Sequence, residues 1–62
     1  MKFIVFDPTA IQQGGMNNAK VFGRTDDINE AKDIAKENNG GAIYEILDEK
    51  TMRMRWIETV WG

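Results

Sequence analysis

Apolar and polar residues follow three different patterns along this chain of 62 residues, and each pattern predicts one kind of element. The first segment, KFIVFD from Lys2 to Asp7, is β-branched and aromatic, and Asp7-Pro8 ends it, so it predicts a strand. Its unbroken apolar run is typical of a central strand, or of one that is covered on both faces. A second short strand is expected from Lys20 to Arg24, returning antiparallel to the first.

The connection between these two strands, Pro8 to Ala19, is polar and contains glycine. Its twelve residues make it long for a domain of this size. Gly14-Gly15 could form the tip of a long hairpin or part of a mobile loop. The sequence leaves both interpretations open.

The segment TDDINEAKDIAKENNGG predicts a helix that packs closely on a sheet. Asp27 suits the N-cap, and Glu30, three residues later, is the expected capping-box partner. Asn38 to Gly41 tolerate the left-handed conformation that ends many helices. A narrow, alanine-rich apolar stripe recurs at helical spacing: Ile28, Ala31, Ile34 and Ala35.

The segments AIYEIL, from Ala42 to Leu47, and TMRMRWIETVW, from Thr51 to Trp61, alternate in polarity and predict a β-hairpin. In the preferred register Ile46 pairs with Met52 and Glu45 lies opposite Arg53, although the loop then lacks the usual glycine. That register gathers on one face Ala42, Tyr44, Ile46, Met52, Met54 and Trp56.

The alternative register pairs Leu47 with Met52 and leaves Glu45 without an obvious partner among Met54 and Trp56. A buried, unpaired carboxylate is costly, and a one-residue slip exchanges the two faces of a strand, so the choice of register matters. The first register is therefore preferred.

The expected fold is a single α+β domain over residues 1–62. Its order is ββαββ, with a four-stranded antiparallel sheet and one helix packed on one face. The preferred register turns Met52, Met54 and Trp56 toward the helix, where they would fill the core. The opposite, open face would carry Arg53, Arg55, Ile57, Thr59 and Trp61, joined by Ile43 and by Ile4 or Phe3.

Composition excludes most catalytic chemistry, because the chain contains no cysteine, histidine or serine. The Ser-His and Cys-His nucleophile systems and the usual zinc ligand sets are therefore absent, and we expect no enzyme activity, metal or cofactor. The net charge of −2 disfavours direct nucleic-acid binding. The apolar run FIVF is too short for a signal peptide or a membrane span, so we expect a cytoplasmic protein with no membrane contact.

The closing strand provides the first candidate contact surface. Tryptophan and arginine are enriched in protein interfaces, so Arg53, Arg55, Ile57 and Trp61 are the first candidates for binding a partner. The alternative is that the arginine stems only shield the sheet and pair with Glu45 and Glu58.

The predicted helix provides a second candidate surface. Glu30, Asp33 and Glu37 are spaced by three and four residues and form one acidic stripe. Such a stripe could face a basic groove on a nucleic-acid-binding protein. The alternative is a solvated helix face, because acidic residues near a helix N-terminus are favoured by the helix dipole.

The segments MKFIVF, DINEAKDIAKENN and TMRMRWIETVW give the chain a layout that resembles small phage-encoded inhibitors, anti-CRISPR proteins in particular. The resemblance implies a compact protein that binds a host protein or ribonucleoprotein complex and blocks it sterically. No functional residues carry over from it, because no family-specific motif is present.

We therefore expect a non-enzymatic inhibitor, encoded by a phage or mobile element, of a bacterial nucleic-acid-processing assembly such as a CRISPR effector complex. Two alternatives stay open. One is a structural homo-oligomer, such as a homodimer whose open sheet faces pack together. The other is a single-stranded nucleic-acid-binding module.

Overall fold

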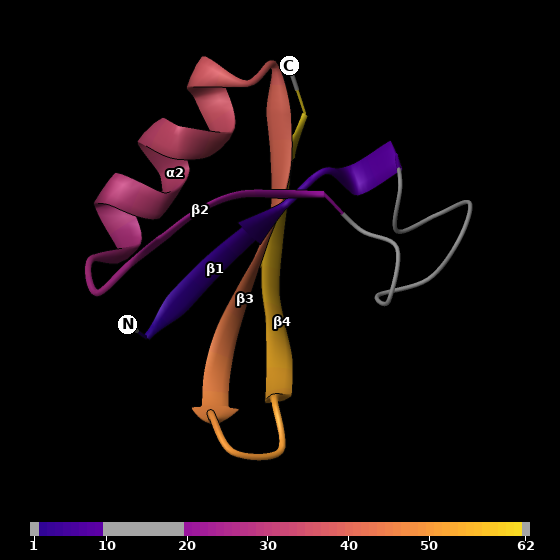
Figure 1. Cartoon of the computed structure of the whole chain (residues 1–62). Coiled ribbons are helices and arrows are strands. Elements are labelled where there is room, and N and C mark those ends of the chain that lie inside the picture. Colours follow the sequence, from indigo (N-terminus) through magenta and orange to yellow (C-terminus); the bar gives the residue numbers. More distant parts are fainter. Residues whose placement is uncertain (1, 10–19, 62) are drawn as a thin grey trace.

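The computed structural model describes residues 2–9 and 20–61, and it contains a four-stranded antiparallel sheet with a helix packed against one face (Figure 1). The strands lie in the order β2-β1-β3-β4, so the predicted α+β, ββαββ fold is confirmed. Residues 10–19, most of the connection with Gly14-Gly15, lie outside the described part. The elements are β1 (Phe3–Phe6), β2 (Val21–Thr25), α2 (Ile28–Glu37), β3 (Gly40–Asp48) and β4 (Arg53–Trp61).

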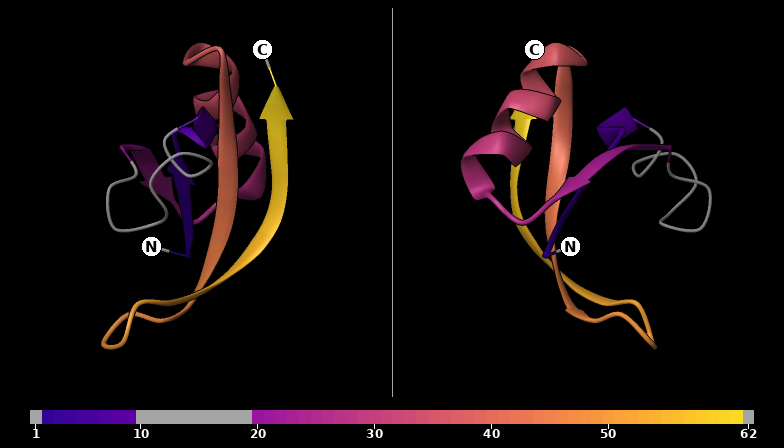
Figure 2. Two further views of the ribbon diagram at one scale, coloured as in Figure 1. Left: turned by 90° about the vertical axis from the view of Figure 1, so that its right-hand side faces the viewer. Right: turned by 60° about the vertical axis from the view of Figure 1, so that its left-hand side comes forward.

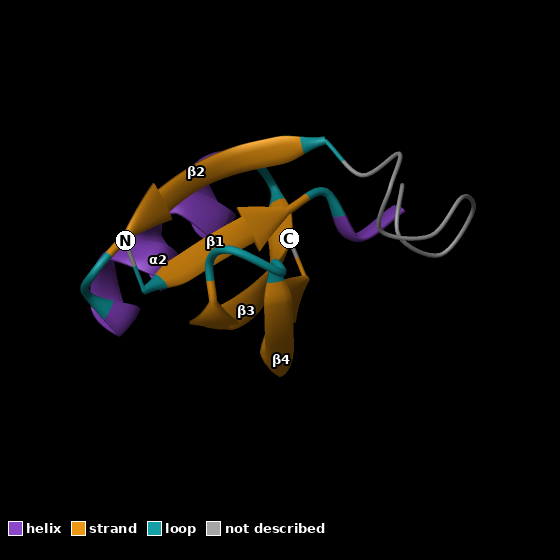
Figure 3. Cartoon of the chain, turned by 60° about the horizontal axis from the view of Figure 1, so that its bottom comes forward, coloured by secondary structure: helices purple, strands orange, loops and turns teal. Residues whose placement is uncertain are grey.

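Strand β1 lies inside the sheet, as its continuous apolar run predicts. All four of its side chains are buried. Val5 lies opposite Gly23 of β2 on one side and Ile43 of β3 on the other. Figure 3 shows β1 and β2 side by side, with α2 behind them. A segment that is covered on both faces needs no polar alternation, which is why FIVF has none.

Helix α2 begins and ends close to the predicted residues. The Asp27 carboxylate accepts a hydrogen bond from the Asn29 N–H (2.8 Å), so the predicted N-cap is confirmed. The predicted capping box is wrong, because the Asp27 N–H donates to the Thr25 hydroxyl (3.2 Å) instead of to Glu30. At the other end Asn39 adopts a left-handed conformation (φ 63°), as expected of the Asn-Asn-Gly-Gly segment.

The core lies between α2 and the sheet. Its buried members come from three elements: Phe3, Val5, Ala31, Ala35 and Ile43. The small alanine side chains let the helix approach the strands closely. The approach is closest at Gly41, where a Cβ atom would lie 2.9 Å from the Cβ of Ala35 and 2.6 Å from a methyl group of Val5.

The register of the β3–β4 hairpin differs from both predicted registers. Glu45 lies opposite Arg55 rather than Arg53, and Ile46 lies opposite Met54 rather than Met52. Met52 cannot pair, because it belongs to the turn and adopts a left-handed conformation (φ 55°). The turn is supported by Asp48, whose carboxylate accepts from the Lys50 N–H at 2.9 Å.

The predicted faces of β4 are also wrong, for two reasons. Ile43 is fully buried on the helix side, so α2 covers the face that was expected to be open. The register also shifts between Ile43 and Tyr44, and this irregularity inserts Ile57 as an extra residue in β4. Residues after Ile57 therefore change face relative to those before it.

The corrected sheet has one face against α2. The opposite face, called the open face below, is exposed along β4, whereas Ile4 and Phe6 of β1 are buried on it. On the helix side of β4, Ile57 and Val60 pack on the core, and Glu58 pairs with Lys32 of α2. Phe3 also belongs to this side, whereas Ile4, opposite Tyr44, lies on the other. On the open face β4 places Met54, Trp56, Thr59 and Trp61.

The far end of the β3–β4 hairpin bends away from α2, toward the side of the sheet where β1 and β2 lie (Figure 2). The bend brings the turn near β2, where an Arg24 guanidinium nitrogen lies 3.8 Å from a Glu49 carboxylate oxygen. The open face is therefore curved rather than flat.

Candidate protein-binding surface

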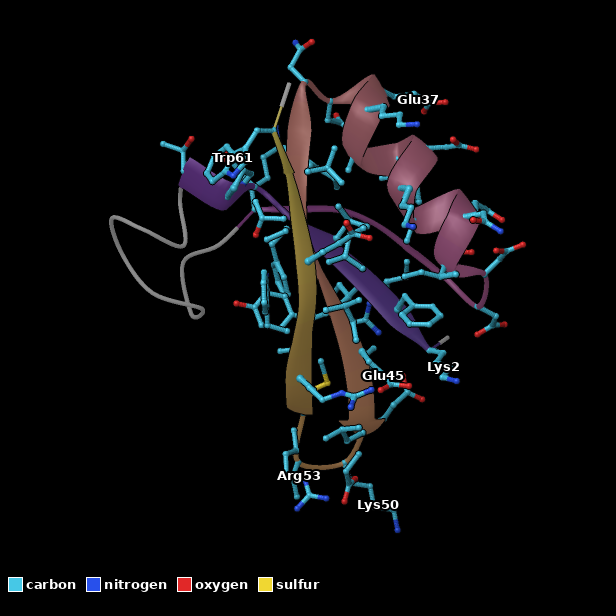
Figure 4. The ribbon with its side chains drawn as sticks, turned by 180° about the vertical axis from the view of Figure 1, so that it is seen from behind. Lys2, Glu37, Glu45, Lys50, Arg53 and Trp61 are labelled. Carbon is cyan, nitrogen blue, oxygen red and sulfur yellow. The ribbon has the colours of Figure 1, made fainter. Side chains whose placement is uncertain are left out.

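The structure does not bring the four candidate residues of the closing strand together. Arg55 and Ile57 lie on the helix side of β4, whereas Trp61 lies on the open face and is 63% exposed. Arg53 is exposed at the end of the hairpin, next to the turn. Figure 4 shows Arg53 and Trp61 at opposite ends of β4.

Arg55 has a structural role in an ion cluster around Glu45. An Arg55 guanidinium nitrogen lies 2.6 Å from one oxygen of Glu45, and the Lys2 ammonium lies 3.4 Å from the other. Figure 4 shows Lys2 and Glu45 near each other, on the α2 side of the hairpin. The hydrogen bond from Arg55 lowers the pKa of Glu45, aided by the charges of Arg55 and Lys2 and opposed by desolvation. Pairing with Glu45 was the alternative interpretation of the arginines, and it holds for Arg55.

The Glu45 cluster makes stability dependent on pH. Because the pKa of Glu45 in the folded chain lies below its ordinary 4.5, the folded state binds fewer protons and the stabilisation is complete above that value. It is lost as the pH falls through the folded pKa. We expect Glu45→Gln and Arg55→Gln to be less stable than wild type at neutral pH and to lose less of their stability below pH 4.5. Urea unfolding at several pH values measures this difference.

Glu37→Gln is the matched control, because Glu37 is exposed on α2 and makes no ion pair with residues 2–9 or 20–61. It should keep the acid dependence of the wild type. A Glu45→Gln variant with the same loss of stability in acid as the wild type would contradict this role of the cluster.

The open face carries the largest exposed aromatic surface in the described part of the chain. Phe6 is buried against Tyr44, with ring centroids 5.6 Å apart in an edge-to-face arrangement. Next to Tyr44, Trp56 is 56% exposed, and its indole N–H donates to the Thr59 hydroxyl (3.0 Å). Trp61, on the same face, lies on the side of the sheet away from α2 (Figure 4). The open face thus carries two exposed tryptophans and the half-buried Tyr44, which packs on the buried Phe6.

The sequence prediction missed Trp56 and Tyr44 as surface candidates. Both were assigned to the core because the alternation was interpreted with the helix on their side of the sheet. Their aromatic character was visible in the sequence. The face that α2 covers was not, because it depends on contacts between segments far apart in the chain.

The acidic residues of α2 lie where they were predicted, on the surface. Glu30, Asp33 and Glu37 are all exposed, while Ala31 and Ala35 turn toward the sheet. They form no further contact in the described part of the chain that would distinguish a binding stripe from a solvated helix face. The helix dipole favours Glu30 in the first turn of α2, and solvation accounts for Asp33 and Glu37.

Other chemistry finds little support in the residues that the structure describes. Among them no group of three His, Cys, Asp or Glu side chains is placed to hold a metal ion. None of the helices found there is both long enough and apolar enough to cross a membrane. Comparisons with protein-family models, curated proteins and solved structures gave no match. The evidence on function is therefore the geometry of the surface itself.

Proposed function

We propose that this chain is a non-enzymatic protein-binding module whose open sheet face contacts its partner. The observation that carries this proposal is the exposure of Trp56 and Trp61, 56% and 63%, on the sheet face opposite α2. A domain this small needs its large apolar side chains in the core, because that core supplies only about 3–5 kcal/mol of net stability. Leaving two tryptophans in solvent is best explained by a partner that buries them.

The arrangement of the open face suits binding with little loss of side-chain freedom. Tyr44 is held by its contact with Phe6, and Trp56 by its hydrogen bond to Thr59. Aromatic anchors that are already ordered lose less conformational entropy on binding. Trp61 is the most exposed member, and we expect it to be the first to contact the partner.

The proposed mode of action is steric. A module that performs no chemistry of its own can still inhibit a larger assembly by covering a surface that the assembly needs. In line with the resemblance in layout, we propose a bacterial nucleic-acid-processing complex as the target, with a CRISPR effector as the first to test. A protein surface suits this face better than a phosphate backbone, because the chain carries a net charge of −2.

The test is affinity capture from bacterial lysate, compared between three forms of the tagged chain. We expect wild type to retain a stoichiometric partner and Trp56→Ser with Trp61→Ser to lose it. The matched control, Asp33→Asn with Glu37→Gln, alters the acidic stripe on the opposite side and should retain the partner. Circular dichroism establishes that all three are folded. The purified partner is then assayed for nucleic-acid binding or cleavage with increasing amounts of the chain.

Three results would overturn the proposal. If the double tryptophan variant still retains the partner, the open face is not the contact surface. Capture lost in the α2 control would assign binding to Glu30, Asp33 and Glu37 instead. A wild-type chain that instead shifts single-stranded oligonucleotides in a salt-dependent way would make it a nucleic-acid-binding module.

A further inference from the structure

Strand β4 is a long and weakly protected edge of the sheet. It has nine residues and, among residues 2–9 and 20–61, pairs only with β3, while the other edge strand, β2, has five. Natural edge strands are usually kept from pairing by short length, proline, lysine or a cover. The sequence RMRWIETVW contains neither proline nor lysine, and its protection is limited to two arginines, Glu58 and the bulge at Ile57.

The backbone groups that point outward from this edge can be deduced from the hydrogen bonds of β3. The Ile46 N–H donates to the carbonyl oxygen of Lys2 (2.7 Å), so the backbone of Ile46 faces β1. Backbone groups alternate in direction along an antiparallel strand. The backbone N–H and C=O of Glu45 therefore face β4, opposite the backbone of Arg55. Met54 and Trp56, on either side of Arg55, therefore point their N–H and C=O groups away from the sheet.

The same alternation applies beyond the bulge. Ile43 faces β4 and lies opposite Glu58, so Thr59 and Trp61 point their backbone groups outward. The four outward-facing residues are also the four residues of β4 whose side chains lie on the open face: Met54, Trp56, Thr59 and Trp61.

We infer that β4 pairs antiparallel with β4 of a second copy of this chain, forming a two-fold symmetric dimer with one continuous sheet. In the matching register Trp56 lies opposite Thr59 of the second copy, and Met54 lies opposite Trp61. This register places every outward-facing backbone group opposite another one. It also keeps all of these side chains on one face, with both α2 helices on the other. The strand is thus complementary to itself.

The charges on the helix side of β4 favour the same arrangement. In this register Glu58 of one copy lies diagonally across from Arg55 of the other, an attractive cross-strand neighbour. A parallel arrangement would instead place Arg53 and Arg55 beside their own copies. Arg53 makes no ion pair within residues 2–9 and 20–61. Antiparallel pairing is therefore the arrangement with charge complementarity.

A dimer of this kind also suits the size of the chain and the exposed side chains of β4. Domains below about 70–80 residues commonly gain stability by oligomerisation. Pairing would place Trp61 beside Met54 of the second copy. This inference does not rest on the proposed function. The two open faces would lie on the same side of the shared sheet and remain available to a partner.

The test is sedimentation of Thr59→Pro and Thr59→Ala beside wild type over a range of concentrations. Both variants lose the hydroxyl that binds Trp56, but only proline removes the outward N–H, which β3 does not use. We expect wild type and Thr59→Ala to dimerise and Thr59→Pro to have a dimer Kd raised by about tenfold or more. Amide exchange at Met54, Trp56, Thr59 and Trp61 should slow as the wild-type concentration rises.

A second variant keeps the test decisive if Thr59→Pro fails to fold. Glu58→Lys combined with Lys32→Glu reverses the ion pair between β4 and α2, which spans 3.3 Å, while placing a cationic side chain near Arg55 of the second copy. We expect this exchange to weaken the dimer, most strongly at low salt. A wild-type chain that stays monomeric, or a dimer unaffected by either variant, would overturn the inference. If wild type is monomeric and Thr59→Pro loses a captured host protein, the edge binds a partner strand instead.

Discussion

Gly41→Ala is expected to unfold a large fraction of the molecules, although it adds one methyl group. The new Cβ would lie 2.6 Å from a methyl group of Val5, 2.9 Å from the Cβ of Ala35 and 3.2 Å from its Cα. The last of these atoms belongs to the backbone of α2, so the helix itself must move. Overpacking of this kind costs about 1–3 kcal/mol and occasionally more. The whole core supplies only about 3–5 kcal/mol of net stability.

Urea unfolding of single and double variants measures the effect and its cause. Ala35→Gly alone should cost about 1 kcal/mol, because glycine is a poor helix former. The double variant, Gly41→Ala with Ala35→Gly, should lose clearly less stability than the sum of the two single variants, because Ala35→Gly removes one of the clashing atoms. Additive effects of the two changes would show that they do not contact each other and would contradict the close approach of α2 to β3.

Local sequence chemistry was sufficient to predict the elements of this fold. Asp27 as N-cap and the Asn-Asn-Gly-Gly segment as C-cap place α2 to within a few residues, because capping depends on neighbouring residues alone. The continuous apolar run of β1 identified a central strand, since only a strand covered on both faces has no need for polar alternation.

The register of the hairpin was not predictable in the same way. Three features decide it: the left-handed Met52 in the turn, the register shift between Ile46 and Asp48, and the bulge at Ile57. Most residues avoid the left-handed region, so a methionine there gives no signal in the sequence. Asp48 did give one, because an aspartate that accepts the N–H two residues later commonly begins a turn.

Two errors, the missed bulge and the wrong choice of the face that α2 covers, carried over to the candidate surface. A bulge adds one residue, and one residue exchanges the faces of everything beyond it. The bulge at Ile57 consequently separates Trp61 from Arg55 and Ile57. Arg55 and Ile57 lie on the helix side, and Trp56 on the open face, because α2 covers the face that was expected to be open. The prediction that the closing strand carries exposed tryptophan and arginine was correct for Trp61, Arg53 and Arg55, but these residues do not form one cluster.

A pair of substitutions compares the observed faces with the predicted ones directly. Ile43 is fully buried, so Ile43→Ala should cost about 2–5 kcal/mol, the usual range for removing a buried isoleucine side chain. Trp56 is more than half exposed, so Trp56→Ala should cost only about 1 kcal/mol, mainly through its bond to Thr59. The smaller side chain is thus expected to matter more for folding.

Thermal and urea unfolding at the lowest usable concentration measure this contrast without interference from dimer formation. The two faces predicted from the alternation would give the opposite order, with Trp56 in the core and Ile43 in solvent. Equal losses for both variants would contradict the assignment of faces. A larger loss of stability in Ile43→Ala than in Trp56→Ala, together with loss of partner capture when Trp56 and Trp61 are changed, would assign different roles to the two faces of the sheet. One face then holds the helix, and the other is free to bind.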